Sequence, residues 1–337
     1  VGETGDIVYT KSPLKSNPYG IIKANKGKNG IVSTLYAVYK PKQSANPEFV
    51  QIYFEQDARM NNYMHPLVNK GAKNDMKVSA ENALKGQIVF PDIKEQRTIS
   101  EFFRNLDTLI TLHQRKYEKL VNIKKSMLDK MFPPNGASVP EIRFKGFTDP
   151  WEQRKLGEIA KEVVRNDPAS DAPIMMITAG NGFIEQSDRY AFNNAGESLK
   201  KYILLECGEL AYNHGASKLR PYGSCFALTT VEKARIPFVY HCFSVEKSNP
   251  EFLSIELNGA NVENQLRKIV SSGARMDGLL NIAYSEYTEV TVQLPKKEEQ
   301  DWIAKFFKQL DTLITLHQRK LEKLQNIKKS CLEKMFV

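Results

Sequence analysis

Polar and basic side chains gather in loops rich in Gly, Ser and Asn, where they suit nucleic-acid contacts. Lys and Arg can bind phosphates, whereas Arg and Asn can also read base edges. The sequences GAKND at 71–75 and GARMD at 273–277 occupy matching places in two halves of the chain. We regard these as the stronger pair of candidates, although their glycines could equally serve a turn.

Known catalytic patterns are not found in the sequence. It has no G-x-x-x-x-G-K-[ST] phosphate loop, no G-x-S-x-G elbow and no H-E-x-x-H helix. The NPYG sequence at 17–20 lacks the second proline of the N-P-P-[YF] loop of adenine methyltransferases, and we interpret it as a turn. AGNGF at 179–183 is likewise expected to be a turn, and Asp92 is expected to favour a helix start. An enzyme is therefore disfavoured.

Composition agrees with a globular protein that binds an acidic partner. The 337 residues are 41% hydrophobic and 26% charged, which suggests two domains, and the net charge is +9. Residues 133–298 nevertheless hold 19 Lys and Arg against 21 Asp and Glu, so DNA contacts there must use a local cluster. The four cysteines have no C-x-x-C spacing, and we expect reduced thiols, no metal site, no membrane span and a cytoplasmic location.

A long internal repeat organises the chain. Residues 95–132 and 299–336 match at a constant offset of 204, with 28 of 38 positions identical. Both copies lack Gly and Pro and carry apolar residues at three- and four-residue steps, which predicts two helices of about 55 Å at ~1.5 Å per residue. In the first copy this stripe is Ile99, Phe102, Phe103, Leu106, Ile110, His113, Tyr117, Leu120, Met127 and Met131.

The two helices are expected to pack antiparallel around a pseudo-two-fold axis, with His113 and His317 in packing or hydrogen-bonding roles. A second apolar flank on each helix is predicted to bind partner subunits. These flanks consist of Leu109, Leu112, Ile123 and Leu128, and of Leu313, Leu316, Ile327 and Leu332.

A globular domain precedes each helix. GDIVY at 5–9 parallels GELAY at 208–212, but about 57 residues of the second domain precede its copy and only four precede the first. We therefore expect the first domain to lack roughly 50 N-terminal residues. Strands are predicted at 31–39 and 237–245, and helices at 47–58 and 250–270, so each domain is mixed α and β.

The duplicated helix and the segment FKGFTDPWEQRKLGEIAKEV at 144–163 strongly resemble the specificity subunit of Type I restriction–modification systems. The resemblance covers the whole chain. It implies an α+β fold with two mixed α/β target recognition domains separated by two long antiparallel coiled-coil-like helices in a pseudo-two-fold repeat. The domains are then 1–91 (N-terminally incomplete) and 151–295, the helical spacers 92–132 and 296–337, and the linker 133–150.

The same resemblance implies a non-catalytic subunit for DNA methylation and host defence. Such a subunit reads a bipartite, asymmetric sequence in double-stranded DNA and holds two methyltransferase subunits. It carries no cofactor itself. S-adenosylmethionine belongs to the methyltransferase partners, and ATP and Mg belong to the motor-nuclease restriction subunits. The alternative from the residues alone is a coiled-coil scaffold that does not bind DNA; salt-dependent binding to a bipartite duplex distinguishes the two.

Side-chain chemistry and loop position select the candidate DNA contacts, each of which could also be a solvated surface residue. In the first domain they are Lys11, Lys15, Asn17, Tyr19, Lys23, Lys26, Lys28, Lys70, Lys73 and Asn74. In the second they are Asn181, Asn213, His214, Lys218, Arg220, Tyr222, Ser271, Ser272 and Arg275.

Overall fold

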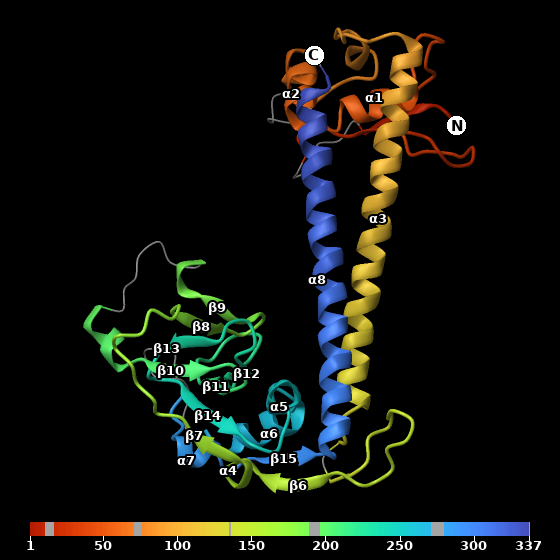
Figure 1. Ribbon diagram of the computed structural model, residues 1–337. Coiled ribbons are helices and arrows are strands. Elements are labelled where there is room, and N and C mark those ends of the chain that lie inside the picture. Colours follow the sequence, from red (N-terminus) through yellow and green to blue (C-terminus); the bar gives the residue numbers. More distant parts are fainter. Residues whose placement is uncertain (11–16, 71–75, 135, 189–195, 271–279, 337) are drawn as a thin grey trace. The chain divides into compact units, whose positions relative to one another are not determined.

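A computed structural model describes residues 1–10, 17–70, 76–134, 136–188, 196–270 and 280–336 (Figure 1). The chain divides into two compact units, each containing one globular domain and parts of both long helices. Unit 1 comprises residues 1–119 and 314–337, and unit 2 comprises residues 120–313. The long helices are α3 (Ile93–Lys130) and α8 (Lys297–Lys334).

The globular part of unit 1 is a small antiparallel sheet covered by helices. Its three-stranded sheet has the order β2-β1-β3. Its elements are β1 (Ile7–Thr10), β2 (Ile22–Ala24), β3 (Tyr36–Tyr39), α1 (Pro47–Tyr53), α2 (Asp57–Met64), η1 (His65–Leu67), β4 (Asn69–Lys70), β5 (Met76–Lys77) and η2 (Asn82–Leu84). Tyr9, Ile22, Val50 and Met64 form the centre of its core.

The globular part of unit 2 is larger, and its main sheet has the order β12-β11-β14-β7. The pairs β10–β13, β15–β6 and β8–β9 flank this sheet. The elements are β6 (Glu152–Lys155), α4 (Leu156–Ile159), β7 (Ala160–Glu162), β8 (Met175–Thr178), β9 (Gly182–Glu185), η3 (Gln186–Asp188), η4 (Gly196–Lys201), β10 (Ile203–Glu206), β11 (Leu210–Asn213), β12 (Ser224–Ala227), β13 (Lys233–Ile236), β14 (His241–Val245), α5 (Pro250–Leu257), α6 (Ala260–Ile269), α7 (Tyr284–Tyr287) and β15 (Thr291–Leu294).

The two sheets share one register, which demonstrates the duplication beyond the helices. Ile7 on β1 lies opposite Ala24 and Tyr39. Leu210 on β11 lies opposite Ala227 and Phe243. Ile7 and Leu210 are 203 residues apart, as are Ala24 and Ala227, and Tyr39 and Phe243 are 204 apart. The strands β1, β2 and β3 therefore correspond to β11, β12 and β14.

A buried glutamine joins each domain to the start of its long helix in the same way. The side-chain oxygen of Gln96 accepts from the backbone of Asn46 at 2.8 Å, and its amide donates to the Pro91 carbonyl at 2.9 Å. Gln300 repeats both bonds, at 2.8 Å to Asn249 and 2.9 Å to Pro295. These bonds satisfy buried polar groups, so they fix the helix start relative to its domain.

The same two asparagines cap the first helix of each domain. The side chain of Asn46 accepts from Phe49 N at the start of α1, and that of Asn249 accepts from Phe252 N at the start of α5. A proline follows each cap, in the first turn, where its missing N–H costs nothing.

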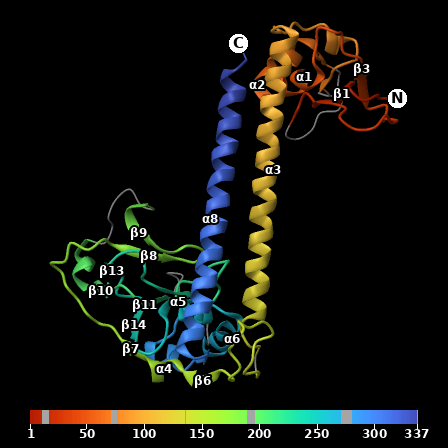
Figure 2. The ribbon, with the colours of Figure 1, turned by 45° about the vertical axis from the view of Figure 1, so that its right-hand side comes forward.

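The long helices run antiparallel within each unit, as predicted (Figures 1 and 2). In unit 1, His113 and His317 meet with their Nδ1 atoms 2.8 Å apart, which confirms a hydrogen-bonding role. In unit 2, Lys124 forms an ion pair with Asp311. The expected stripe is correct at Ile99, Phe103 and Leu106, which are buried, but wrong at Phe102, which is 41% exposed.

Several predicted elements are shorter than the sequence pattern suggested. The strands at 31–39 and 237–245 contract to β3 and β14, and the helix at 250–270 splits into α5 and α6. At this split Asn258 is the C-cap of α5 and Gly259 the N-cap of α6, and the Asn258 side chain bonds both the N–H and the carbonyl of Cys225. The helix at 47–58 splits likewise into α1 and α2.

Candidate nucleic-acid interface

A loop of equal length leaves the central strand of each sheet and ends in Pro-Tyr-Gly. The hydroxyl of Tyr9 donates to the carbonyl of Tyr19 at 2.9 Å, and that of Tyr212 donates to the carbonyl of Tyr222 at 2.6 Å. Burial raises the pKa of Tyr9 to about 12, which keeps the donor protonated. Tyr19 and Tyr222 are therefore anchored to the central strand in the same way.

Glycines 20 and 223 close these loops, and no other residue type fits there. Gly20 has φ +83° and Gly223 has φ +81°. An added Cβ would lie 2.0 Å from the Thr10 carbonyl oxygen in the first domain and 2.6 Å from that of Asn213 in the second. The NPYG sequence thus forms a tight turn against the strand, as its composition suggested.

Asn213 and His214 connect several segments at the end of β11. The Asn213 amide donates to the Ile177 carbonyl at 3.1 Å, and its side-chain oxygen accepts from Gly215 N at 2.9 Å. The carbonyl of His214 accepts from Leu280 N at 2.8 Å. The loop after β11, the strand β8 and the segment that begins at residue 280 are therefore tied to one point.

The buried His214 ring faces two carbonyl oxygens. Nδ1 lies 2.8 Å from the oxygen of Leu280, and Nε2 lies 2.7 Å from that of Val239. A neutral imidazole has one N–H and can donate to one of them, whereas an imidazolium can donate to both. His241 stacks on this ring at 5.1 Å, and its own pKa is lowered by burial and by the proximity of His214. His214 is thus placed to position loops.

The turn between β8 and β9 lies beside the loop that follows β11. Gly180 of this turn lies close to Leu219, whose side chain is 3.7 Å from a Cβ built on that glycine. Asn181 and Lys218 are exposed on the turn and the loop. Leu219 is 66% exposed and was not among the candidates selected from the sequence. Its position between Lys218 and Arg220 in a loop was the available signal, since an apolar tip can contact a base or a sugar.

Arg220 and Tyr222 turn toward the protein. Arg220 donates to the Asn258 carbonyl at 2.6 Å, and burial lowers the pKa of its guanidinium. The Tyr222 carbonyl is the acceptor of the Tyr212 bond described above. The structure therefore places Asn181, Asn213, His214 and Lys218 on adjoining segments, while Arg220 anchors its loop to α5.

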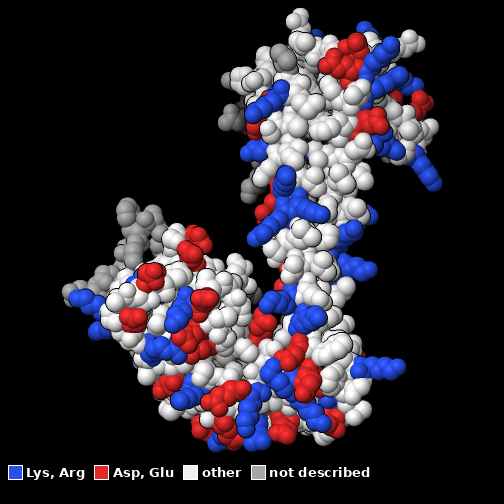
Figure 3. Space-filling view, in the orientation of Figure 1, with Lys and Arg blue, Asp and Glu red and all other residues white. Residues whose placement is uncertain are grey.

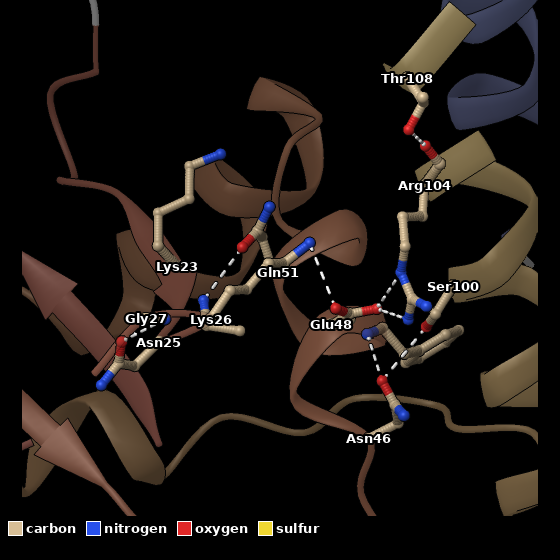
Figure 4. Close-up of polar contacts among 12 residues, drawn as sticks. Lys23, Asn25, Lys26, Gly27, Asn46, Glu48, Gln51, Ser100, Arg104 and Thr108 are labelled. Atoms are coloured by element: carbon tan, nitrogen blue, oxygen red, sulfur yellow. Dashed lines mark hydrogen bonds and ion pairs between the residues drawn. The ribbon is translucent and has the colours of Figure 1, made fainter. Parts of the chain in front are cut away.

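Two of the first-domain candidate lysines, Lys23 and Lys26, pair with carboxylates. Lys23 lies 3.1 Å from Glu55. Lys26 lies 3.3 Å from Glu48, which also pairs with Arg104 (Figure 4). These lysines remain exposed, and Lys28 is exposed as well. A phosphate that binds Lys26 would therefore compete with Glu48.

Asn17 and Tyr19 flank the loop anchor of the first domain. Asn17 donates to Asp57 at 3.5 Å, and the Tyr19 ring meets His65 edge-on at 6.4 Å. The remaining candidates lie outside the described residues or have side chains outside them: Lys11, Lys15, Lys70, Lys73, Asn74, Ser271, Ser272 and Arg275. Contact with DNA stays a prediction for every candidate.

Acidic and basic side chains are interspersed over the visible face of the second domain, which agrees with the nearly balanced charge of residues 133–298 (Figure 3). Any DNA contact in this domain must therefore depend on local side chains of the loops and not on net charge.

The model of the family "Type I restriction modification DNA specificity domain" matches residues 148–326, more than half of the chain. The chain belongs to this DNA specificity family. Its role is therefore in DNA sequence recognition within Type I restriction–modification systems.

Solved structures of specificity subunits resemble this DNA specificity chain at low sequence identity. The S subunit from M. genitalium is 12% identical, and the match covers 100% of this chain and 84% of the S subunit. The TM-score of 0.53 supports a shared fold. The HsdS subunit from Thermoanaerobacter tengcongensis is 17% identical, and the match covers 100% of this chain and 81% of the HsdS chain, with a TM-score of 0.47. A chain from a structure described as the structural basis of complex assembly and conformational transition of the type I R-M system is 15% identical. The match covers 99% of this chain and 82% of that chain, with a TM-score of 0.45.

The helices of this specificity chain expose matching apolar residues. Leu109 and Leu112 are 44% and 45% exposed, and their counterparts Leu313 and Leu316 are both 44% exposed. Ile327 is 38% exposed and Ile123 is half-buried. Leu128 and Leu332 instead pack against the cores of units 2 and 1. Among the described residues, no helix has the length and apolar character to span a membrane.

Proposed function

We propose that this chain is the non-catalytic specificity subunit of a Type I restriction–modification complex and reads a bipartite, asymmetric site in double-stranded DNA. The observation that carries the proposal is the duplicated framework with unlike loops. Sheet register, tyrosine anchor, closing glycine and glutamine junction recur in both domains. The loops between them differ, with Asn17 where the second domain has Arg220. One framework with two sets of reading residues suits two different half-sites.

The first test is selection of bound sequences from random duplexes, with the methyltransferase subunits present. We expect two short conserved blocks separated by a non-specific spacer. Lys218→Ala should weaken binding by about 1 kcal/mol or more and lower the salt dependence, because an exposed lysine contacts phosphate best. Glu232→Ala, on an exposed bend, is the matched surface control. One continuous block, or no sequence preference, would contradict bipartite reading.

We propose further that the exposed helix flank binds two methyltransferase subunits, which supply S-adenosylmethionine, and that restriction subunits supply ATP and Mg chemistry. The paired exposure of Leu112 and Leu316 supports two equivalent docking surfaces. Leu112→Asp together with Leu316→Asp should reduce the mass of the assembly, measured by light scattering, while each domain stays folded. Thr111→Asp together with Thr315→Asp, at the exposed neighbouring positions, is the matched control and should assemble normally. Normal assembly of the leucine double variant would reject this surface.

A further inference from the structure

One side of α1 carries polar side chains that face β2 and the loop after it. Glu48 and Gln51 on α1 and Glu55 just beyond its end are spaced three and four residues apart, so they lie on the same side. The Gln51 side-chain oxygen accepts from the backbone N–H of Ala24 at 3.0 Å, and its amide donates to Glu55 at 3.3 Å. The three side chains therefore line the edge of the sheet, since β2 is its outer strand.

Glu48 is shared between a lysine of this loop and a cation of a long helix. Its Oε1 lies 3.3 Å from Lys26, and its Oε2 pairs with Arg104 on α3, so the two cations meet the carboxylate from opposite sides (Figure 4). Burial alone would raise the pKa of Glu48, but the hydrogen bond from Arg104 and the charge of Lys26 outweigh burial and lower it. The carboxylate therefore stays ionised beside a lysine whose side chain is 50% exposed.

Glu55 repeats this arrangement with the other long helix. Its Oε1 lies 3.1 Å from Lys23, whose side chain is 54% exposed, and its Oε2 lies 3.0 Å from Lys328 on α8. Lys328 also lies 2.8 Å from Asp107 on α3, so it keeps a partner when the charge of Glu55 is removed. Among the described carboxylates, Glu55 alone lies within ion-pair distance of Lys23.

Unit 2 keeps the pairing with the long helix and lacks the loop lysine. Glu251 takes the place of Glu48 and pairs at 2.6 Å with Lys308 on α8. At the position of Lys26, the same strand register gives the uncharged Thr229. The helix contact therefore does not require a loop lysine, and the pairing of that lysine in unit 1 needs a separate explanation.

We propose that Glu48 and Glu55 are positioning residues that restrain DNA binding by the first domain, because each holds a lysine that a phosphate would otherwise bind. This inference rests on the proposed function, in which Lys26 and Lys23 contact DNA. A phosphate must break the lysine–carboxylate pair, which offsets part of its own attraction. The carboxylate stays bound to its helix cation, so its charge remains near the phosphate and opposes it. The sequence-independent part of the affinity is thereby kept low.

The test measures the affinity of the complex assembled with methyltransferase subunits for fluorescent duplexes, by anisotropy over a series of KCl concentrations. Glu48→Gln and Glu55→Gln should each tighten binding about threefold, since an exposed ion pair no longer competes with phosphate. Each should also steepen the slope of log affinity against log salt by up to about one unit, as one more lysine neutralises a phosphate. Structural damage would weaken binding, so the direction of the change separates a positioning role from a structural one.

Two controls tie the gain to the loop lysines. Glu251→Gln removes the corresponding carboxylate in unit 2, where no loop lysine is released, and should leave affinity and salt dependence unchanged. In a chain that already carries Lys26→Gln, Glu48→Gln should give no gain, whereas a general effect of removing negative charge would persist. Thermal unfolding of each variant checks that its fold is intact.

Unchanged or weaker DNA binding by both single variants would overturn the proposal. So would an equal gain in Glu251→Gln, or a gain from Glu48→Gln that persists without Lys26. In each of these cases, sequence selection by the unmodified complex would still support the proposed function. Absence of DNA binding by the unmodified complex would overturn both.

Discussion

The two globular domains share a framework of hydrogen bonds and strand pairing but differ in their loop residues and in some buried side chains. Both have a tyrosine bonded to the Pro-Tyr-Gly turn and a glutamine that joins the domain to its long helix. They differ in the polar residues of the loops and in the buried groups beneath them. Glu256, for example, is buried on α5, where the corresponding position on α1 is Tyr53. The comparison separates residues that maintain the fold from residues free to set specificity.

The strongest challenge to the shared framework is substitution of the closing glycines. Gly20→Ala and Gly223→Ala should each destabilise their own domain by roughly 3 kcal/mol or more, because the residue has positive φ and its new Cβ would meet a backbone oxygen. Thermal unfolding followed by hydrogen exchange would locate each effect. Gly136→Ala, at positive φ with open space around it, is the control and should cost less. Equal losses for all three variants would mean that the close approach contributes nothing.

Glu256 tests the difference between the domains. Burial raises its pKa to about 7, while the backbone N–H of Gln293 opposes the shift. The folded state therefore holds this proton more tightly than the unfolded state, so stability decreases as pH rises from about 4.5 to 7, by roughly 3 kcal/mol. Glu256→Gln should remove this loss in urea titrations between pH 5 and 8. Glu251→Gln, at a half-buried position of the same helix where the carboxylate pairs with Lys308, should leave it intact.

His214 gives a smaller and more local effect. His214→Phe keeps an aromatic ring but removes both ring nitrogens, so neither the Leu280 nor the Val239 carbonyl can receive a hydrogen bond from this side chain. We expect a loss of roughly 1–2 kcal/mol in DNA affinity, confined to the half-site of the second domain. Affinity for duplexes mutated in either half-site would be measured. An equal loss at both half-sites, or none at either, would show that His214 does not position the reading loops.

The sequence predicted those features that depend on local pattern. The helices follow from apolar spacing, and the mixed α and β fold with two antiparallel helices is confirmed. The domain boundaries and the DNA contacts stay predictions. Sequence alone did not reveal that Arg220 turns to the Asn258 carbonyl, because that bond joins residues far apart in the chain. The sequence pattern also placed Phe102 on the buried stripe, because apolar periodicity alone does not show which of two adjacent phenylalanines is the buried one.

Unit 1 combines residues 1–119 with residues 314–337, and this affects how the protein is made. Arg59 donates to the carbonyl of Leu332 at 2.7 Å, and Phe336 lies in the aromatic cluster of the first domain. During translation, the ribosome must synthesise all of residues 120–313 before these partners exist. At ~5–20 residues per second, the first domain waits roughly 10–40 s for its last helix. The first domain is therefore completed only after residues 120–313 have been synthesised, and until then the surface that contacts residues 314–337 stays uncovered.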